Sequence, residues 1–210
     1  MRSYLTIAIV FFAALACSCA NPAANKPKAT VANAAPESDS AKPANAETLA
    51  ISPENSKVEF VAAKVTRSHN GSFKQFAGAI DLVKNSVESS RVSIDIQTSS
   101  VVTDEPDLTK HLQTPDFFDV AKYPKANFTS TKIEPAGDVN YNVTGNFDLH
   151  GVKKSIRFPA EIKVAPDSVS VSAEFSINRQ DFKLVYPGKA DDLIRDGVVI
   201  KLTLKVPRKP

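Results

Sequence analysis

Histidine and carboxylate side chains are the groups in this 210-residue chain that could perform chemistry, and the stretch HLQTPDFFDV at 111–120 brings them together. A histidine such as His111 beside a carboxylate could support hydrolysis of an ester. No nucleophile-elbow motif accompanies it, and Asp116 and Asp119 equally suit the positive end of a short helix. The stretch leaves a lipid-ester hydrolase open as an alternative, but it assigns no catalytic residue.

The three histidines could also bind a metal ion, but their positions argue against it. His69, His111 and His150 fall in separate connecting segments and lack the short spacing of a local ligand set. The chain also shows no phosphate-binding or dinucleotide-binding glycine motif. We therefore expect no metal site and no cofactor.

The N-terminus predicts export from the cytoplasm. Arg2 gives a positive start, Tyr4 to Ala16 form an apolar run too short for an ordinary transmembrane helix, and small residues follow. This order is typical of a secretory signal peptide.

Both cysteines, Cys17 and Cys19, end that apolar run in the sequence ALACSC. A bacterial lipoprotein has its lipidated cysteine at such a place, whereas a disulfide between these two would enclose a single residue. Residues 1–19 are thus predicted to be a lipoprotein signal peptide and lipobox region, with Cys17 lipidated and Cys19 as the alternative. No aspartate follows either cysteine, which favours an anchor in the outer membrane facing the periplasm.

Residues 20–50 are mostly Ala, Asn, Pro, Ser and Lys and contain no aromatic residue. Such a composition buries too little apolar surface to offset the entropy of ordering, so a disordered tether is predicted. Residues 51–210 remain for one domain with a sizeable core. They hold 22 Lys and Arg against 20 Asp and Glu, a near balance that gives no electrostatic basis for nucleic-acid binding.

Alternation of apolar and polar residues runs through this domain and predicts antiparallel strands with one wet face. In VSIDIQT, for example, Val92, Ile94 and Ile96 share one face. No long amphipathic helix is predicted to cover a flat sheet, so the economical fold is an all-β, eight-stranded antiparallel up-and-down barrel of lipocalin-like architecture. The predicted strands are 57–65, 72–83, 92–98, 125–133, 139–150, 154–164, 168–177 and 199–206.

Long connections gather at one end of that barrel, because alternate links of a meander share an end. They include residues 103–124, predicted to form short helices between strands three and four, and the long connection 178–197 before the last strand. Thr114 and Pro115 predict a helix start, with Thr as the N-cap and Pro at the first helical position. Phe117 and Phe118 would then lie on a small lid over the barrel mouth.

The stretch HLQTPDFFDVAKYPKANFTST at 111–131, followed by VTGNFDLHGVKKSIRFPAEI and FSINRQDF, resembles the YceI-like family of lipid- and polyisoprenoid-binding proteins. FKQFAGAIDL at 73–82 is similar to that family's second strand. The resemblance covers the domain from about Ser56 to Val206. It implies a lipocalin-like barrel whose elongated apolar cavity holds one long isoprenoid or fatty chain, and it implies no catalysis.

Small residues in the inward register predict a hollow barrel, although barrel architecture alone favours a packed core. Ala62, Gly78, Gly145, Ala160 and Ala173 would leave space, but the glycines could instead relieve bending. Together with the resemblance, the pattern predicts a cavity for a polyisoprenoid, an isoprenoid quinone or a fatty-acid derivative. Its predicted lining is Phe60, Ala62, Phe76, Ile80, Ile94, Phe117, Phe118, Phe128, Val143, Phe147, Ala173, Phe175 and Leu202.

An anionic head on such a ligand would require cations at the mouth. Lys64 ends the first predicted strand, and Lys154 begins the sixth, both in the inward register. Arg179 and His111 belong to the same elaborated end. These four residues are the predicted headgroup contacts, although a lysine at a strand end is more often only solvated.

Changing both Cys17 and Cys19 to Ser should release the protein from the membrane fraction. Covalent acyl chains contribute about 0.8 kcal/mol per buried methylene, so their loss removes the attachment. Fractionation of cells after a high-salt wash measures the release, and the two single variants show which cysteine carries the lipid. Persistent membrane association of the double variant would contradict a lipid anchor.

Overall fold

The computed structural model describes residues 21–208, which form an all-β protein with one α-helix, α1 (Pro106–Leu112). The predicted signal region, with Cys17 and Cys19, lies outside the described residues. Between residues 21 and 208, no helix is long and apolar enough to span a membrane. The strands are β1 (Thr30–Asn33), β2 (Glu47–Ile51), β3 (Ser56–Ala63), β4 (Ser68–Phe73), β5 (Phe76–Val83), β6 (Ser86–Gln97), β7 (Val101–Thr103), β8 (Lys125–Pro135), β9 (Asn140–Leu149), β10 (Val152–Val164), β11 (Ser168–Asn178), β12 (Gly188–Lys189), β13 (Asp192–Leu193) and β14 (Gly197–Pro207). The 3-10 helices are η1 (Glu37–Ser40), η2 (Thr98–Ser100) and η3 (Arg179–Phe182).

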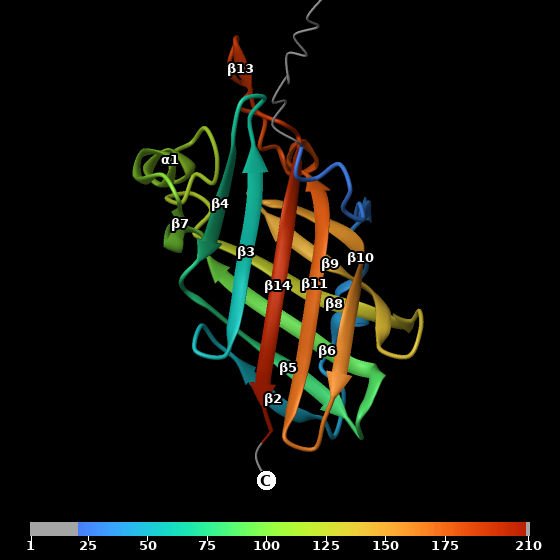
Figure 1. The fold of residues 1–210 in the computed structure, drawn as a ribbon. Coiled ribbons are helices and arrows are strands. Elements are labelled where there is room, and N and C mark those ends of the chain that lie inside the picture. The colour runs from blue at the N-terminus through green and yellow to red at the C-terminus, as the bar shows by residue number, and fades with distance from the viewer. Residues whose placement is uncertain (1–20, 209–210) are drawn as a thin grey trace, which may run out of the picture.

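Twelve strands form one sheet in the order β2-β5-β6-β8-β9-β10-β11-β14-β3-β4-β7, with β1 beside β10. β12 and β13 form a separate hairpin. The large sheet curls, so that β3, β14 and β11 lie across β5, β6 and β8 (Figure 1). The pairing of β14 with β3 returns the last long strand to the first long strand. The predicted all-β antiparallel class is therefore confirmed.

The predicted count of eight strands was too low, partly because the predicted strand 72–83 is broken. Phe73 ends β4 and Phe76 begins β5. Residues three apart in one straight strand point to opposite faces, so both rings can face the interior only if the strand breaks between them. β4 then pairs with β3 and β7, whereas β5 pairs with β2 and β6.

The structure also differs from the predicted disordered tether at 20–50. From residue 21 onward this segment follows the sheet, with β1 paired to β10 and β2 paired to β5. Ala29 and Leu49 are buried. An added strand is held mainly by main-chain hydrogen bonds, which depend little on side-chain composition. A segment poor in apolar residues can therefore be ordered by the sheet.

The connection from β7 to β8 contains one predicted helix and a turn in place of the other. α1 begins at Pro106. Proline suits the start of a helix, because a backbone N–H there would have no acceptor within the helix. Thr114 does not cap a second helix, because its hydroxyl donates to the carbonyl of His111 at 2.8 Å. Residues 115–118 form a turn. The Thr114 side chain, which the sequence predicts as the cap of a second helix, thus satisfies a backbone carbonyl at the C-terminal end of α1.

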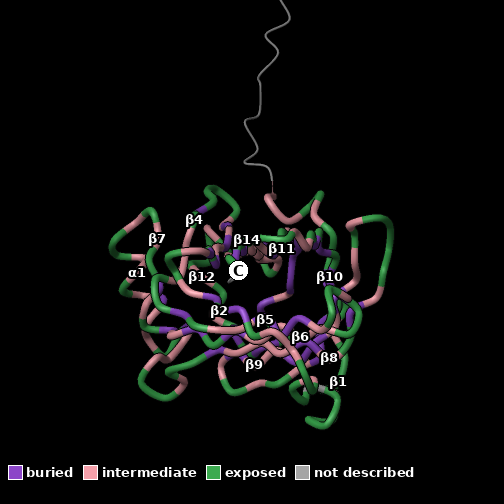
Figure 2. Tube along the Cα trace, turned by 90° about the horizontal axis from the view of Figure 1, so that it is seen from below, coloured by how far each residue is buried: buried purple, intermediate pink, exposed green. Residues whose placement is uncertain are grey.

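Buried residues, many of them apolar, are concentrated on the strands of the curled sheet, and the outer loops are largely exposed (Figure 2). In the main core cluster, Phe158 stacks on Phe175 with 4.1 Å between ring centroids. Phe147 meets the fully buried Phe182 edge-on at 5.1 Å. A second cluster joins α1 and the turn after it to β3 and β7.

A buried carboxylate ties β2 to β5. Asp81 is 2% exposed and accepts a hydrogen bond from the Thr48 hydroxyl at 2.8 Å. Lys42 and Arg91 each lie 3.2 Å from one of its oxygens. Burial raises the pKa of Asp81, but hydrogen bonds from Thr48, Lys42 and Arg91 outweigh burial and hold this pKa below its ordinary value. The charged form of Asp81 therefore stabilises the fold.

Because the folded-state pKa is depressed, the stabilisation by Asp81 is present above the unfolded-state pKa of about 3.9 and is lost as pH falls through the folded-state pKa. Asp81→Asn should lower the free energy of unfolding at pH 7 by about 1.5 to 3 kcal/mol, the range for hydrogen bonds to charged groups. The variant should also lose part of the acid dependence of stability. Urea denaturation across this pH range measures both effects, with Asp95→Asn at an exposed position of β6 as the control. Equal losses in the two variants would contradict this role of Asp81.

Candidate functional site

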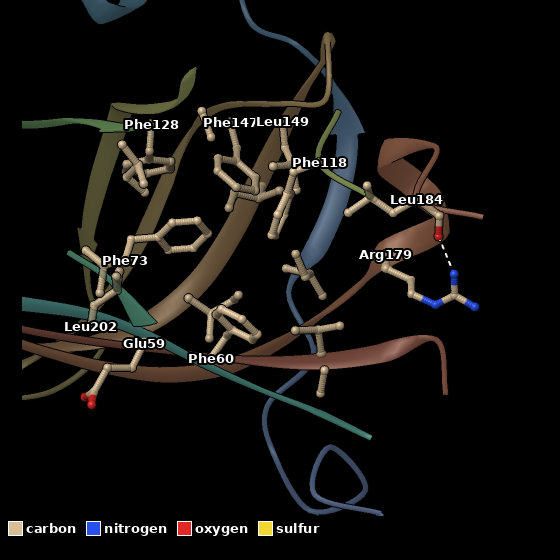
Figure 3. A pocket seen from close by; sticks show the side chains of 18 of the residues that line it. Glu59, Phe60, Phe73, Phe118, Phe128, Phe147, Leu149, Arg179, Leu184 and Leu202 are labelled. Carbon is tan, nitrogen blue, oxygen red and sulfur yellow. Dashed lines mark hydrogen bonds between the residues drawn. The ribbon is translucent and has the colours of Figure 1, made fainter. Parts of the chain in front are cut away.

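An apolar cavity of about 150 Å³ lies inside the curled sheet. Leu112, Leu184 and Ile194 help to line it, which places it toward the end that carries α1 and the β12–β13 hairpin (Figure 1). Strands β3, β4, β6, β8, β9, β10, β11 and β14 all contribute to its wall. In Figure 3, Phe60 and Phe73 point into a space shared with the rings of the opposite wall.

Nine of the thirteen predicted lining residues line this cavity. The other four, Phe76, Ile80, Val143 and Ala173, are buried in the main core cluster and do not line it. Strand register separates inward from outward side chains, but it does not reveal where along the barrel the packing leaves a gap. Ligand contact by the nine stays a prediction. The nine are Phe60, Ala62, Ile94, Phe117, Phe118, Phe128, Phe147, Phe175 and Leu202.

The small inward residues contribute less to this space than their size suggests. Ala62 lines the cavity, but the buried Ala160 does not. A Cβ at Gly145 would lie 2.4 Å from the ring of Phe128, and one at Gly78 would lie 2.2 Å from a backbone carbonyl oxygen. Rings and backbone therefore already occupy the space beside these two glycines.

Fifteen residues beyond those nine line the cavity, and some of them carried a readable signal. Ile156 and Phe158 share the inward register of their predicted strand, so alternation identifies them. Leu184 and Ile194 belong to a long connection where no alternation applies. The fifteen are Val58, Glu59, Phe73, Ile96, Leu112, Ala126, Leu149, Ile156, Phe158, Ile177, Arg179, Leu184, Ile194, Val198 and Ile200.

Phe117 and Phe118 both line the cavity, but they are held differently. Phe117 is 8% exposed, and its ring meets those of His111 and Tyr186 at 5.0 and 5.3 Å between centroids. Phe118 is half-buried and meets Phe73 edge-on at 5.7 Å. The turn after α1 thus holds two aromatic rings against the cavity without forming a second helix.

Arg179 is the cationic residue of the lining, and its side chain is buried. Its guanidinium donates to the carbonyl of Leu184 (Figure 3) and to two further backbone carbonyls of the same connection. It also pairs with Asp196 at 3.1 Å. These bonds fix the connection before β14. Glu59, the other charged residue of the lining, directs its carboxylate away from the rings (Figure 3).

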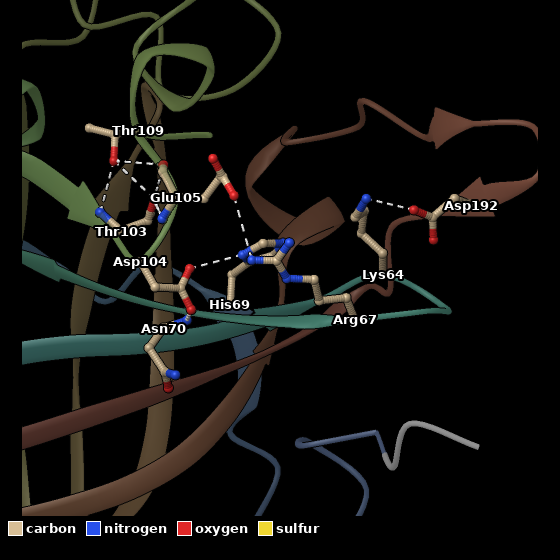
Figure 4. Close-up of polar contacts among 9 residues, drawn as sticks. All are labelled: Lys64, Arg67, His69, Asn70, Thr103, Asp104, Glu105, Thr109 and Asp192. Atoms are coloured by element: carbon tan, nitrogen blue, oxygen red, sulfur yellow. Dashed lines mark hydrogen bonds and ion pairs between the residues drawn. The ribbon is translucent and has the colours of Figure 1, made fainter. Parts of the chain in front are cut away.

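The other predicted headgroup residues do not join Arg179 at the cavity. Lys64 pairs at 2.6 Å with Asp192 of the β12–β13 hairpin (Figure 4), and this hydrogen bond lowers the pKa of Asp192. Lys154 lies on β10 beside β1. The Nε2 atom of His111 bonds at 2.8 Å to a carboxylate in its own connection. The four predicted cations are therefore spread over the end of the barrel, each with a different neighbour.

The three histidines occupy separate environments. The Nδ1 atom of the buried His69 lies 2.9 Å from Asp104 (Figure 4). Burial raises the pKa of Asp104, but hydrogen bonds from a backbone amide and from His69 outweigh it and leave this pKa below its ordinary value. His111 has its own carboxylate partner, and His150 packs against Tyr123. Within residues 21–208, no three metal-ligating side chains come together.

A family profile described as YceI-like domain matches residues 49–206. A UPF0312 protein of Pseudomonas putida strain F1 is 33% identical over 125 residues, which cover 57% of this chain and 65% of the relative. A UPF0312 protein of Pectobacterium carotovorum strain PC1 is 33% identical over 120 residues, which cover 54% of this chain and 62% of the relative. The similarity therefore spans less than two thirds of the length of these relatives.

Three solved structures are similar in fold. The crystal structure of BcnA from Burkholderia cenocepacia matches with a TM-score of 0.67 at 25% identity and covers 74% of this chain and 98% of that one. A YCEI protein of Campylobacter jejuni matches at 0.57 and 28% identity, with coverages of 67% and 85%. A Saccharophagus degradans domain, described as polyisoprenoid binding, matches at 0.64 and 18% identity, with coverages of 79% and 100%. The last similarity shows the fold alone.

Truncation of the two lid phenylalanines should affect stability unequally. Phe117→Ala should lower the free energy of unfolding by about 3 kcal/mol or more, because it removes a buried ring from the second core cluster. Phe118→Ala should cost less, because that ring is only half-buried. Urea denaturation measures the difference, with Val185→Ala at a position that is 62% exposed as the control. Equal losses for the two phenylalanines would contradict this assignment.

Proposed function

Because the chain belongs to the YceI-like family, we propose that it is a non-catalytic binding or carrier protein that holds one long-chain apolar molecule inside its barrel. The observation that carries this proposal is the cavity, whose described lining is apolar except for Glu59 and Arg179. Binding pockets for small molecules are typically apolar with a few polar groups. A hydrocarbon chain buried there gains about 25 cal/mol per Å² of apolar surface removed from water.

The proposed ligand is a polyisoprenoid, an isoprenoid quinone or a fatty-acid derivative. The Saccharophagus domain of the same fold is described as polyisoprenoid binding, which suggests isoprenoids as the first class to test. The cavity of about 150 Å³ is smaller than the roughly 300 Å³ at which ligand pockets usually begin. A cavity of about this volume in another protein binds molecules as small as benzene or xenon. Binding of a long chain therefore requires the aromatic lining to move apart.

The polar end of the ligand is proposed to lie near Arg179, at the end of the cavity beside Leu184. The guanidinium there donates to backbone carbonyls and pairs with Asp196. A ligand headgroup would add to this set of bonds, with Lys64 and His111 further out. A neutral or weakly polar head suits this end best, because Arg179 already has a carboxylate partner.

The protein is proposed to be exported and anchored to the outer membrane through lipidated Cys17, or through Cys19, so that it faces the periplasm. Near the first described residues, the Cβ of Ala23 lies 2.9 Å from the position of a Cβ on Gly197, where β14 begins at the end of the barrel that carries the cavity. An anchor attached shortly before these residues would keep this end of the barrel near the membrane surface, where apolar ligands reside.

A hydrolase acting on lipid esters is the second candidate, and His111 with Asp116 is the pair that favours it. The His111 ring meets Phe117, a residue of the cavity lining. A catalytic histidine of this kind must activate a nucleophile by a hydrogen bond. In the part of the chain that the structure describes, the ring of His111 hydrogen-bonds to Asp116 and to no hydroxyl or thiol group. The arrangement therefore suits a structural role better.

Native mass spectrometry of the protein purified without detergent tests the binding proposal, and we expect a co-purifying long-chain molecule. Ala62→Phe should abolish this mass by filling the cavity. Ala173→Phe is the matched control, because Ala173 is buried but does not line the cavity. It should overpack the core at a cost of about 1 to 3 kcal/mol while the cavity stays open.

Wild-type protein without any bound lipid, together with equal loss of stability in both variants, would show a packed core and contradict binding. Ester turnover that is lost in His111→Ala would instead support the hydrolase.

A further inference from the structure

The wall of the barrel contains a seam between β10 and β11. Four residue pairs, from Glu161 with Ser172 to Val164 with Val169, join these strands directly, whereas eleven pairs join β11 to β14. The strands separate before Glu161, where Pro159 offers no amide hydrogen for pairing. The first half of β10 and the second half of β11 therefore do not close the wall by themselves.

A strand from the N-terminal part of the chain fills this seam, and it appears in blue beside the upper ends of β10 and β11 (Figure 1). β1 runs antiparallel to residues 154–157 of β10. On its other side, Ala29 N donates to Ser176 O, and Ser176 N donates to Pro27 O, both at 2.8 Å. Residues 27–33, which we name the N-terminal strap, thus lie between β10 and β11.

The seam adjoins the cavity. Ile156 and Phe158 on β10, and Phe175 and Ile177 on β11, belong to the cavity lining. Phe158 and Phe175 stack across the seam with 11° between their ring planes. Ala29 of the strap is 4% exposed and joins the main core cluster. No strap residue lines the cavity itself, so the strap closes the sheet beside the lining residues of β10 and β11.

Side chains that fasten the strap lie just outside it. Lys26 pairs with Glu174 at 2.8 Å, and the two side chains are 35% and 37% exposed. Asn146 of β9 donates to the carbonyl of Ala35 at 2.9 Å and accepts from its amide at 2.8 Å. Exposed ion pairs contribute little to stability, typically below about 1 kcal/mol. Release of the strap thus breaks a short set of bonds and leaves the pairing of β9 with β10 and of β11 with β14 intact.

We propose that the N-terminal strap is a lateral gate through which the apolar ligand reaches the cavity. Displacement of residues 27–33 lets Phe158 and Phe175 move apart, so that a long chain can slide in sideways. The same movement widens a cavity that is too small for such a chain. The barrel end offers a harder path, because Phe117 and the bonds of Arg179 hold its connections in place. This inference rests on the proposed binding function.

A reversible disulfide across the gate tests the proposal. Thr30 and Arg157 are exposed and lie opposite each other in β1 and β10, so Thr30→Cys with Arg157→Cys can lock the strap. Cys17 and Cys19 are changed to Ser in the same full-length chain. The matched control is Ser172→Cys with Thr203→Cys, an exposed pair that joins β11 to β14. The probe is methyl cis-parinarate, a fluorescent long-chain fatty-acid ester with a neutral head, and stopped-flow mixing measures its uptake.

Oxidation of the gate pair should slow uptake at least about tenfold, an increase of about 1.4 kcal/mol in the barrier. A reductant should restore the rate, and oxidation of the control pair should leave it unchanged. Equal uptake rates for the oxidised and reduced gate pair would overturn the proposal.

Amide hydrogen exchange of the wild-type chain provides a readout that needs no ligand. The amides of Ala29 and Ser176 form the hydrogen bonds between the strap and β11. They should exchange at least about tenfold faster than the amides that pair β11 with β14. Equal protection of the two sets would overturn the gate. Wild-type protein that takes up no probe would overturn the proposed function instead, and the exchange measurement would still decide whether the strap opens.

Discussion

Each strand of this protein must pair its backbone amides and carbonyls while it turns one row of apolar side chains toward a shared interior. The long strands from β6 to β14, joined by β3, meet this double requirement over most of the wall. Where they leave main chain unpaired, short strands supply the missing bonds. β2 covers the outer edge of β5, β7 covers the edge of β4, and β1 fills the seam between β10 and β11. Three of the strands beyond the expected eight, β1, β2 and β7, are therefore a consequence of gaps in the main wall.

The interior is filled largely by aromatic rings, and this explains why only a small cavity remains. A Cβ at Gly71 would lie 2.1 Å from the ring of Phe60, so the ring of one strand occupies the place of a side chain on the next. Ring centroids lie between 4.1 Å for Phe158 with Phe175 and 5.8 Å for Phe60 with Phe73. Flat rings in edge-on and tilted contacts cannot fill all space, and the remaining gap is the cavity.

Polar interactions stabilise the connections and leave the cavity apolar. Arg179 holds the segment before β14, and the Lys64–Asp192 pair links the β3–β4 turn to the β12–β13 hairpin. These groups define the end of the barrel and bound the space in which an apolar chain can lie. A carrier needs this separation, because an unpaired charge inside the cavity would cost free energy when a hydrocarbon chain displaces water.

The sequence by itself determined the all-β class, the inward faces of most strands, a short helix within the connection 103–124 and nine residues of the cavity lining. The strand features follow from local alternation, which acts within a few positions of the chain. Only the tertiary structure decided the break between Phe73 and Phe76, the turn after Thr114 and the order of the segment at 21–50. It also decided which inward residues border the gap, so that Ala62 lines the cavity and Ala173 does not. The reason is physical: main-chain pairing between distant strands and packing depth along the barrel depend on neighbours that alternation within a single strand does not specify.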